Sequence, residues 1–174
     1  MIHILNGSGS GKTSAALGLT IRHLGHGGKV LFVSFCKGSE DYELGEELFF
    51  KKCNEIYHEH LQYYRFGDTM KWESKDNVTL KDRQRASKDW KIILDNIKDC
   101  TLLVLDEASH ALKCSLISQE QILKLIEDYP EKEVILTGRS FPRVLQEKAD
   151  YLTHLFSVKH PFFKGVQARR GFDY

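Results

Sequence analysis

Residues 6–14 constrain this chain more than any other part of its sequence. They read Asn-Gly-Ser-Gly-Ser-Gly-Lys-Thr-Ser, follow the short apolar run of residues 2–5, and precede a segment with helical periodicity. In such a strand–loop–helix unit, glycines let backbone N–H groups turn inward around phosphate oxygens. The strict pattern G-x-x-x-x-G-K-[ST] fails at one position, because Asn6 stands where the first glycine would be. The segment still predicts a phosphate-binding loop rather than a plain flexible turn at a helix start.

Each residue of this loop has an expected role. Lys12 is expected to reach the terminal phosphates of a nucleotide, and the Thr13 hydroxyl is expected to ligate Mg²⁺. The backbone and side chains of the other loop residues are expected to contact the nucleotide as well. These residues are Gly7, Ser8, Gly9, Ser10, Gly11 and Ser14.

Short apolar runs alternate with helical patterns along the rest of the chain, which is typical of βαβ units and a mainly parallel sheet. We expect strands over residues 2–5, 29–34, 61–66, 101–105, 133–137 and 151–158. We expect helices over residues 12–24, 80–97, 119–128 and 142–149, with a charged and partly helical stretch over 40–59. No internal repeat or Pro/Ser-rich linker divides the chain. The prediction is therefore a single α/β domain, residues 1–174, with a P-loop NTPase-like, RecA-like sheet flanked by helices.

Composition excludes several classes of protein. Lys plus Arg total 25 and Asp plus Glu total 24, and this balance argues against a protein that coats nucleic acid, despite the basic and aromatic tail over 159–174. No apolar run reaches the ~18 residues of a membrane span, and no signal-peptide pattern occurs. The four cysteines form no Cys-x-x-Cys pair, which leaves a thiolate zinc site unsupported. We expect a reduced, cytoplasmic protein with neither membrane nor nucleic-acid partners.

A pair of acids is the second candidate site element. Asp106 and Glu107 follow the apolar run 102–105, so they are expected at the carboxyl end of a buried strand, where open α/β sheets bind ligands. An acidic pair alone is more often a device at a helix N-terminus. Beside a phosphate loop, it predicts a site for Mg²⁺, or for Mn²⁺ in its place, with the choice between the two carboxylates left open. Guanine-reading motifs are absent, which favours ATP.

Several motifs together resemble the ATP:corrinoid adenosyltransferases of the cobalamin pathway, which include the cob(I)yrinic acid a,c-diamide adenosyltransferases. The phosphate loop of that family usually reads Gly-Asn-Gly-Lys-Gly-Lys-Thr-Thr, with the alternating glycines seen here. Further matches follow in the family's order over nearly the whole chain. They are Gly25-His26-Gly27, Phe35-Cys36-Lys37-Gly38, Arg65-Phe66-Gly67, Trp72-Glu73, Leu105-Asp106-Glu107, Leu136-Thr137-Gly138-Arg139 and Gly171-Phe172-Asp173-Tyr174.

The resemblance implies an unusual use of ATP. In this family a reduced Co(I) corrinoid attacks the 5′-carbon of ATP and the whole triphosphate leaves, so positioning and charge stabilisation matter more than a general base. It implies catalytic roles for Lys12, Thr13, Glu107 and Arg139, with the Arg139 guanidinium forking onto phosphate oxygens. It also implies a homodimer and an electron-donor protein such as a flavodoxin or a reductase.

Three more residues are candidates that have ordinary structural alternatives. Arg22 on the first helix is a candidate ATP ligand, and the alternative is a charge on the helix surface. Met70 and Trp72 are candidate corrinoid contacts by the resemblance, and the alternative for Trp72 is a hydrophobic anchor under a long loop. Met70 stands where the family has Phe, Ser10 where it has Lys, and His154 where Glu is common. These departures keep two alternatives open: an ATPase or nucleoside kinase, and a nucleotide-binding protein without the corrinoid reaction.

Overall fold

A six-stranded parallel sheet forms the centre of the protein. The computed structural model describes residues 1–37, 43–57, 59–67 and 75–173. The strand order is β3-β2-β4-β5-β1-β6, and each neighbouring pair is parallel. The strands are β1 (Ile2–Asn6), β2 (Val30–Phe35), β3 (Leu61–Phe66), β4 (Leu102–Asp106), β5 (Glu133–Thr137) and β6 (Tyr151–His154).

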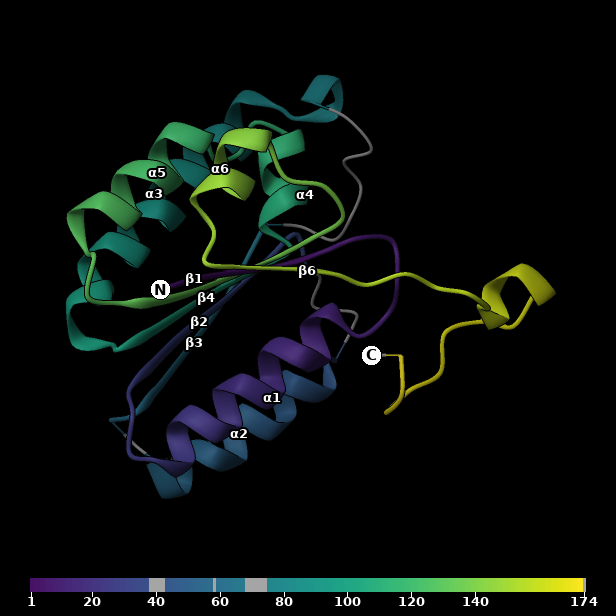
Figure 1. Ribbon diagram of the computed structural model, residues 1–174, viewed down its shortest axis with the longest axis horizontal. Coiled ribbons are helices and arrows are strands. Elements are labelled where there is room, and N and C mark those ends of the chain that lie inside the picture. The colour runs from purple at the N-terminus through teal and green to yellow at the C-terminus, as the bar shows by residue number, and fades with distance from the viewer. Residues whose placement is uncertain (38–42, 58, 68–74, 174) are drawn as a thin grey trace.

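Helices cover both faces of this sheet, which gives three layers (Figure 1). Helices α1 and α2 lie on one face, and α3, α4, α5 and α6 lie on the other. They are α1 (Lys12–Gly25), α2 (Gly45–Tyr57), α3 (Leu80–Asn96), α4 (Ala108–Lys113), α5 (Gln119–Asp128) and α6 (Arg143–Lys148). The α/β architecture expected from the alternating pattern, a parallel sheet flanked by helices, is confirmed.

The central strands are apolar at successive positions because both of their faces are covered. In β2, Val30 and Phe32 pack in the core on the side of α1 and α2, whereas Leu31, Val33 and Phe35 pack in the opposite core. All six residues of β2 and all five of β4 are buried. Because these strands are held in the core on both faces, the positions of their carboxyl ends are fixed. The candidate site lies at those carboxyl ends.

The structure differs from the sequence prediction in two elements that border the site. The last strand ends at His154 rather than at residue 158, because the chain leaves the sheet edge at Leu155 to contact the phosphate loop. Helix α4, directly after Asp106 and Glu107, was not predicted. At six residues it is too short to display a helical period.

The segment after β6 extends away from the three layers (Figure 1). It contains one short 3₁₀ turn, Pro161–Lys164, and its phenylalanines are largely exposed to solvent. Elsewhere, none of the helices in the described part of the chain has both the length and the apolar character needed to cross a membrane.

Candidate functional site

The sheet topology brings four strand ends to one place. In the ladder, Leu5 of β1 pairs with Thr137 of β5, and Ser34 of β2 pairs with Asp106 of β4. Strand β5 lies between β1 and β4, so Thr137 stands between the phosphate loop and Asp106. In open parallel sheets the carboxyl edge is where ligands bind, because loops and helix N-termini meet there.

The phosphate loop is held from the side of β6. The backbone N–H of Gly9 donates to the carbonyl oxygen of Leu155 at 2.8 Å, and the N–H of Leu155 donates to the Asn6 carbonyl oxygen at 2.7 Å. A Cβ on Gly9 would lie 2.7 Å from that Leu155 oxygen, and one on Gly7 would also overlap the Leu155 backbone. Gly7 and Gly11 further have φ values of 115° and 94°, which side chains rarely adopt. The alternating glycines are therefore required for two reasons. Gly7 and Gly9 lie too close to the Leu155 backbone for a side chain, and Gly7 and Gly11 have positive φ angles.

Lys12 is folded back into the loop. Its Nζ donates to the carbonyl oxygen of Gly9 at 2.7 Å, and only 8% of the residue is exposed. Burial lowers the pKa of this ammonium, while the nearby Glu107 carboxylate raises it and the Arg139 guanidinium lowers it. The Lys12 ammonium thus lies within the loop, and the side chains of Ser8, Ser10 and Ser14 are exposed. Their contacts with a nucleotide stay predictions.

Asp106 is a fully buried carboxylate with three donors. The Thr13 hydroxyl donates to Oδ1 at 2.9 Å, the Thr137 hydroxyl donates to the same oxygen at 2.6 Å, and the Lys37 ammonium lies 2.6 Å from Oδ2. Thr137 also accepts the backbone N–H of Glu107 at 3.0 Å. These bonds satisfy the carboxylate and fix its orientation toward Thr13.

Thr13 and Asp106 are suited to a divalent cation. A hydroxyl and a carboxylate held together beside a phosphate loop are the hard oxygen ligands that Mg²⁺ takes along with nucleotide phosphates. Within the described residues, no group of three or more His, Cys, Asp or Glu side chains forms a complete protein-only metal site. The donor set therefore fits a metal that arrives with a nucleotide, and the metal roles of Thr13, Asp106 and Glu107 stay predictions.

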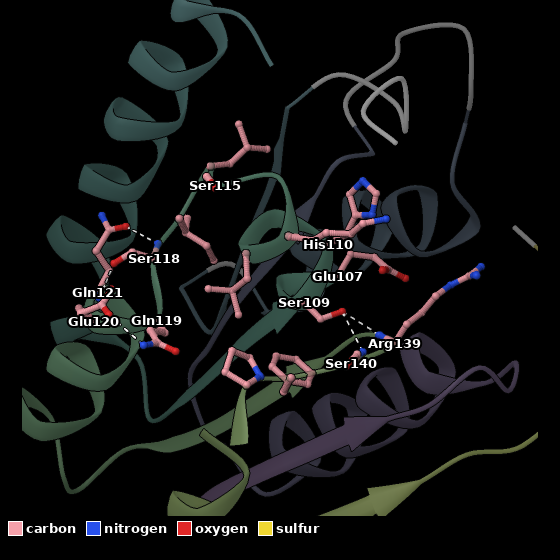
Figure 2. Close-up of a pocket in the computed structure, with 16 residues that line it drawn as sticks. Glu107, Ser109, His110, Ser115, Ser118, Gln119, Glu120, Gln121, Arg139 and Ser140 are labelled. Atoms are coloured by element: carbon pink, nitrogen blue, oxygen red, sulfur yellow. Dashed lines mark hydrogen bonds between the residues drawn. The ribbon is translucent and has the colours of Figure 1, made fainter. Parts of the chain in front are cut away.

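Glu107 is the residue after Asp106, and its carboxylate acts electrostatically on both Lys12 and Lys37. It has a left-handed backbone (φ 57°) and is the N-cap residue of helix α4, with its side chain at the edge of a cavity (Figure 2). Burial raises the pKa of this carboxyl, and the Asp106 carboxylate raises it further. The two acids therefore differ in their surroundings: Asp106 is fully buried among its donors, whereas Glu107 lines the cavity.

Lys37 is a site residue that the sequence reasoning missed, because it was noted only as part of a motif. It follows β2, and its ammonium contacts Glu46 at 3.4 Å as well as Asp106. Burial alone would lower the pKa of this ammonium, but the Asp106 and Glu46 carboxylates outweigh it and hold the pKa above its ordinary value. The sequence shows only a lysine two residues after a strand, and the pairing of that strand with β4 is what brings it to Asp106.

The two candidate arginines lie in different places. Arg139 follows β5, and its backbone N–H donates to the Ser109 hydroxyl at 2.7 Å. Its side chain extends past the side chain of Glu107 (Figure 2). Arg22 is exposed in the last turn of α1, about 15 Å along the helix axis from Lys12. The structure brings Arg139 to the site and leaves Arg22 apart from it. Met70 and Trp72 lie outside the described residues.

A large open cavity adjoins the phosphate site. Its volume is about 1120 Å³, and it lies between α4, the start of α5 and residues 139–142. Glu107 and Arg139 line it at one end, and both act electrostatically on Lys12. Its apolar wall includes Leu112, Leu116, Ile117, Phe141 and Pro142. Figure 2 shows Glu107 and Arg139 close together at this end of the cavity, so these two residues connect it with Lys12 of the phosphate loop.

Comparison with known proteins agrees with these features. The family described as ATP:corrinoid adenosyltransferase BtuR/CobO/CobP matches residues 1–174. A corrinoid adenosyltransferase of Pseudomonas aeruginosa is 35% identical over 97% of this chain and 81% of its own length. One of Escherichia coli is 31% identical over 100% of this chain and 85% of its own length. A solved KaiC-like protein of Pyrococcus horikoshii overlaps 80% of this chain and 62% of its own chain, at 18% identity and a TM-score of 0.41.

Because Gly9 packs against Leu155 and Gly18 has open space around it, replacing each glycine by alanine should have a different effect on ATP binding. Gly9→Ala should weaken MgATP binding by roughly tenfold or more, because the new Cβ would displace the loop from the Leu155 carbonyl. Gly18→Ala, in helix α1 with open space around it, should leave the Kd unchanged and add about 0.5–1 kcal/mol of stability. Calorimetric titration with MgATP and urea unfolding measure the two effects. Equal ATP affinities for both variants would contradict the proposed role of this contact.

Proposed function

The chain belongs to the ATP:corrinoid adenosyltransferase family, and we propose that it binds ATP at the loop of residues 6–14 and the corrinoid in the adjoining cavity. The reaction transfers the 5′-deoxyadenosyl group. The electron pair of Co(I) forms the new cobalt–carbon bond, the bond between C5′ and its oxygen breaks, and triphosphate leaves with the two electrons of that carbon–oxygen bond. The observation that carries the placement is that Glu107 and Arg139 line the cavity and also act on Lys12.

At the nucleotide end, the residues of this chain stabilise a departing polyanion. We assign this task to Lys12, to the loop amides of residues 7–14 and to Arg139, whose planar guanidinium suits two phosphate oxygens. Lys12 would exchange its bond to the Gly9 carbonyl for one to a phosphate oxygen. Because attack by cobalt needs no proton transfer from the nucleophile, these groups act through position and charge.

We propose Thr13 and Asp106 as the residues that hold Mg²⁺, or Mn²⁺, together with the ATP phosphates. The support is the 2.9 Å hydrogen bond between the two side chains and the complete burial of Asp106. The ion would supply positive charge to the leaving triphosphate. Glu107 follows Asp106 and lines the cavity beside Arg139, so we assign it to the border between the metal and the corrinoid.

The corrinoid is assigned to the cavity on the grounds of size, lining and position. Its volume of about 1120 Å³ exceeds the about 300–1,000 Å³ of sites for drug-sized ligands, as a macrocycle requires. The apolar wall formed by Leu112, Leu116 and Phe141 would exclude water from the reacting cobalt. The contacts of Met70 and Trp72 with the corrinoid stay predictions from the family resemblance.

Four further properties belong to the same proposal. We propose that residues 1–174 act as one domain, that the protein is a homodimer, and that a flavodoxin or a reductase supplies the electron for Co(I). A cytoplasmic location is supported by the cysteines, all four of which are free thiols, as is usual in a reducing compartment. Replacing the chemical reductant by reduced flavodoxin in the assay below tests the donor, and fractionation of cells tests the location.

Incubation with MgATP and chemically reduced cobalamin under anaerobic conditions tests the main proposal. We expect the Co(I) absorbance to disappear as adenosylcobalamin and triphosphate form in equal amounts. Lys12→Ala should lower the rate by roughly 100-fold or more, because it removes a charge from the leaving group. Persistence of Co(I) while ATP is converted to ADP would instead indicate a phosphoryl-transfer enzyme.

Filling the cavity should affect one substrate and not the other. Leu116 is half-buried on the cavity wall, away from the phosphate loop. Leu116→Trp should raise the KM for the corrinoid by roughly tenfold or more and leave the Kd for MgATP unchanged. Steady-state assays and ATP titrations measure the two constants, and Leu116→Met, which keeps the volume, serves as the control. A loss of ATP affinity equal to the loss of corrinoid affinity would contradict the assignment of the cavity.

The exposed tail supports the proposed homodimer. Phe162 and Phe163 are 70% and 82% exposed, and they belong to a segment that lies apart from the sheet layers (Figure 1). Large apolar side chains that are exposed together often mark an interface. We expect sedimentation equilibrium to give a dimer, and Phe162→Ser with Phe163→Ser to shift it toward monomer. A wild-type monomer at micromolar concentration would refute this part of the proposal.

A further inference from the structure

The ammonium of Lys37 lies among the oxygen atoms that we assign to the metal. Its Nζ is 2.6 Å from Asp106 Oδ2, 3.4 Å from Glu46 Oε1 and 3.5 Å from Thr13 Oγ1. The side chains of Lys37, Glu46 and Asp106 are 15%, 10% and 0% exposed, so solvent screens these contacts little. Carboxylate and hydroxyl oxygens of this kind are also the ligands that a hard divalent cation takes.

We propose that Lys37 is a built-in counter-ion that holds the metal position until ATP arrives, so that the divalent cation binds with the nucleotide and not before it. This inference rests on the proposed nucleotide function. It gives Lys37 a role in positioning Asp106 and in setting the order in which the metal and ATP bind. Neither the phosphate loop nor the acidic pair explains such a role.

Charge balance at a buried site supports this role. A carboxylate as buried as that of Asp106 is costly without a cation or donors, and Lys37 supplies the cation in the nucleotide-free protein. A divalent ion on Thr13 and Asp106 would stand within a few Å of this ammonium, and two cations repel strongly where water is scarce. The triphosphate adds the negative charge that accommodates both, so the ammonium can transfer to phosphate as the metal takes the carboxylate.

The backbone around Lys37 is anchored, which leaves the side chain as the moving part. Arg65 of β3 donates from Nε to the carbonyl oxygen of Lys37, and its Nη1 pairs with Glu47 Oε2 at 2.6 Å. The flexible four-carbon stem of a lysine lets the ammonium exchange partners without moving the α-carbon. Arg65 therefore keeps Lys37 within reach of both the carboxylates and the phosphate loop.

Binding of Mn²⁺ alone, followed by the loss of its free-ion EPR signal, tests the proposal with a readout that does not involve catalysis. Wild-type protein should bind Mn²⁺ weakly without nucleotide and tightly with ATP. Lys37→Met should bind Mn²⁺ without nucleotide roughly tenfold or more tightly than wild type, because the competing ammonium is gone. Lys37→Arg, which keeps the charge, and Lys124→Met, which removes an exposed lysine, should both resemble wild type. Adding Asp106→Asn to Lys37→Met should remove the gain.

The outcomes separate this proposal from the proposed function. A wild-type protein that binds no Mn²⁺ even with ATP overturns both. Normal binding of Mn²⁺ with ATP, but no gain in Lys37→Met over Lys124→Met, overturns the role of Lys37 alone. Thermal unfolding tests whether the substitution acts through stability. The Tm of Lys37→Met should be lower than that of wild type in EDTA, and Mn²⁺ should raise it more than it raises the Tm of wild type. A Lys37→Met chain that stays unfolded in excess Mn²⁺ also overturns the proposal, since the ion should replace the ammonium.

Discussion

The buried carboxylate of Asp106 is the group on which the arrangement of the site depends. It ends β4 and accepts bonds from Thr13 after β1, Thr137 of β5 and Lys37 after β2. One side chain thus ties together residues that lie at the end of one other strand and in the segments after two more. Removing one partner of a buried charge typically costs about 3–5 kcal/mol, so these segments have little freedom to separate. The geometry that a nucleotide meets is therefore set by the core before any ligand binds.

A second constraint acts on the opposite side of the phosphate loop. Leu155 bonds to both Asn6 and Gly9 through its backbone, and its side chain packs against the core on the side of α1. The loop is therefore clamped between Asp106 with its donors and the chain that continues β6. The exposed aromatic tail starts at the next residue, Phe156. A subunit that held this tail would act on the segment that shapes the phosphate loop, which connects the proposed dimer to the nucleotide site.

The sequence predicted the parts of this structure whose signals are local. Buried strands are visible as apolar runs in the sequence. The glycine–lysine–threonine loop and the acidic pair are recognised by their residue order and by their positions directly after such runs. Lys37, Thr137 and Leu155 could not be identified in this way, because their roles depend on strand order: β2 and β5 flank β4, and β6 flanks β1. Helix α4 is too short for a period, and Arg22 shares a helix with Lys12 but lies at its other end. Local patterns thus found the loop and the acids, whereas pairing across the sheet decided what surrounds them.

The near-neutral composition of the chain acquires a meaning at this site. Lys12, Lys37 and Arg139 lie close to Asp106, Glu107 and Glu46, and each charge has an opposite charge near it. Lys12 bonds to its own loop and Lys37 to Asp106, so these cations are occupied within the protein until phosphates compete for them. A leaving triphosphate offers more negative charge than either internal partner. Each lysine that leaves its internal partner for a phosphate oxygen brings positive charge to the leaving triphosphate. A site whose lysines can exchange partners in this way therefore suits an adenosyl transfer that expels the whole triphosphate.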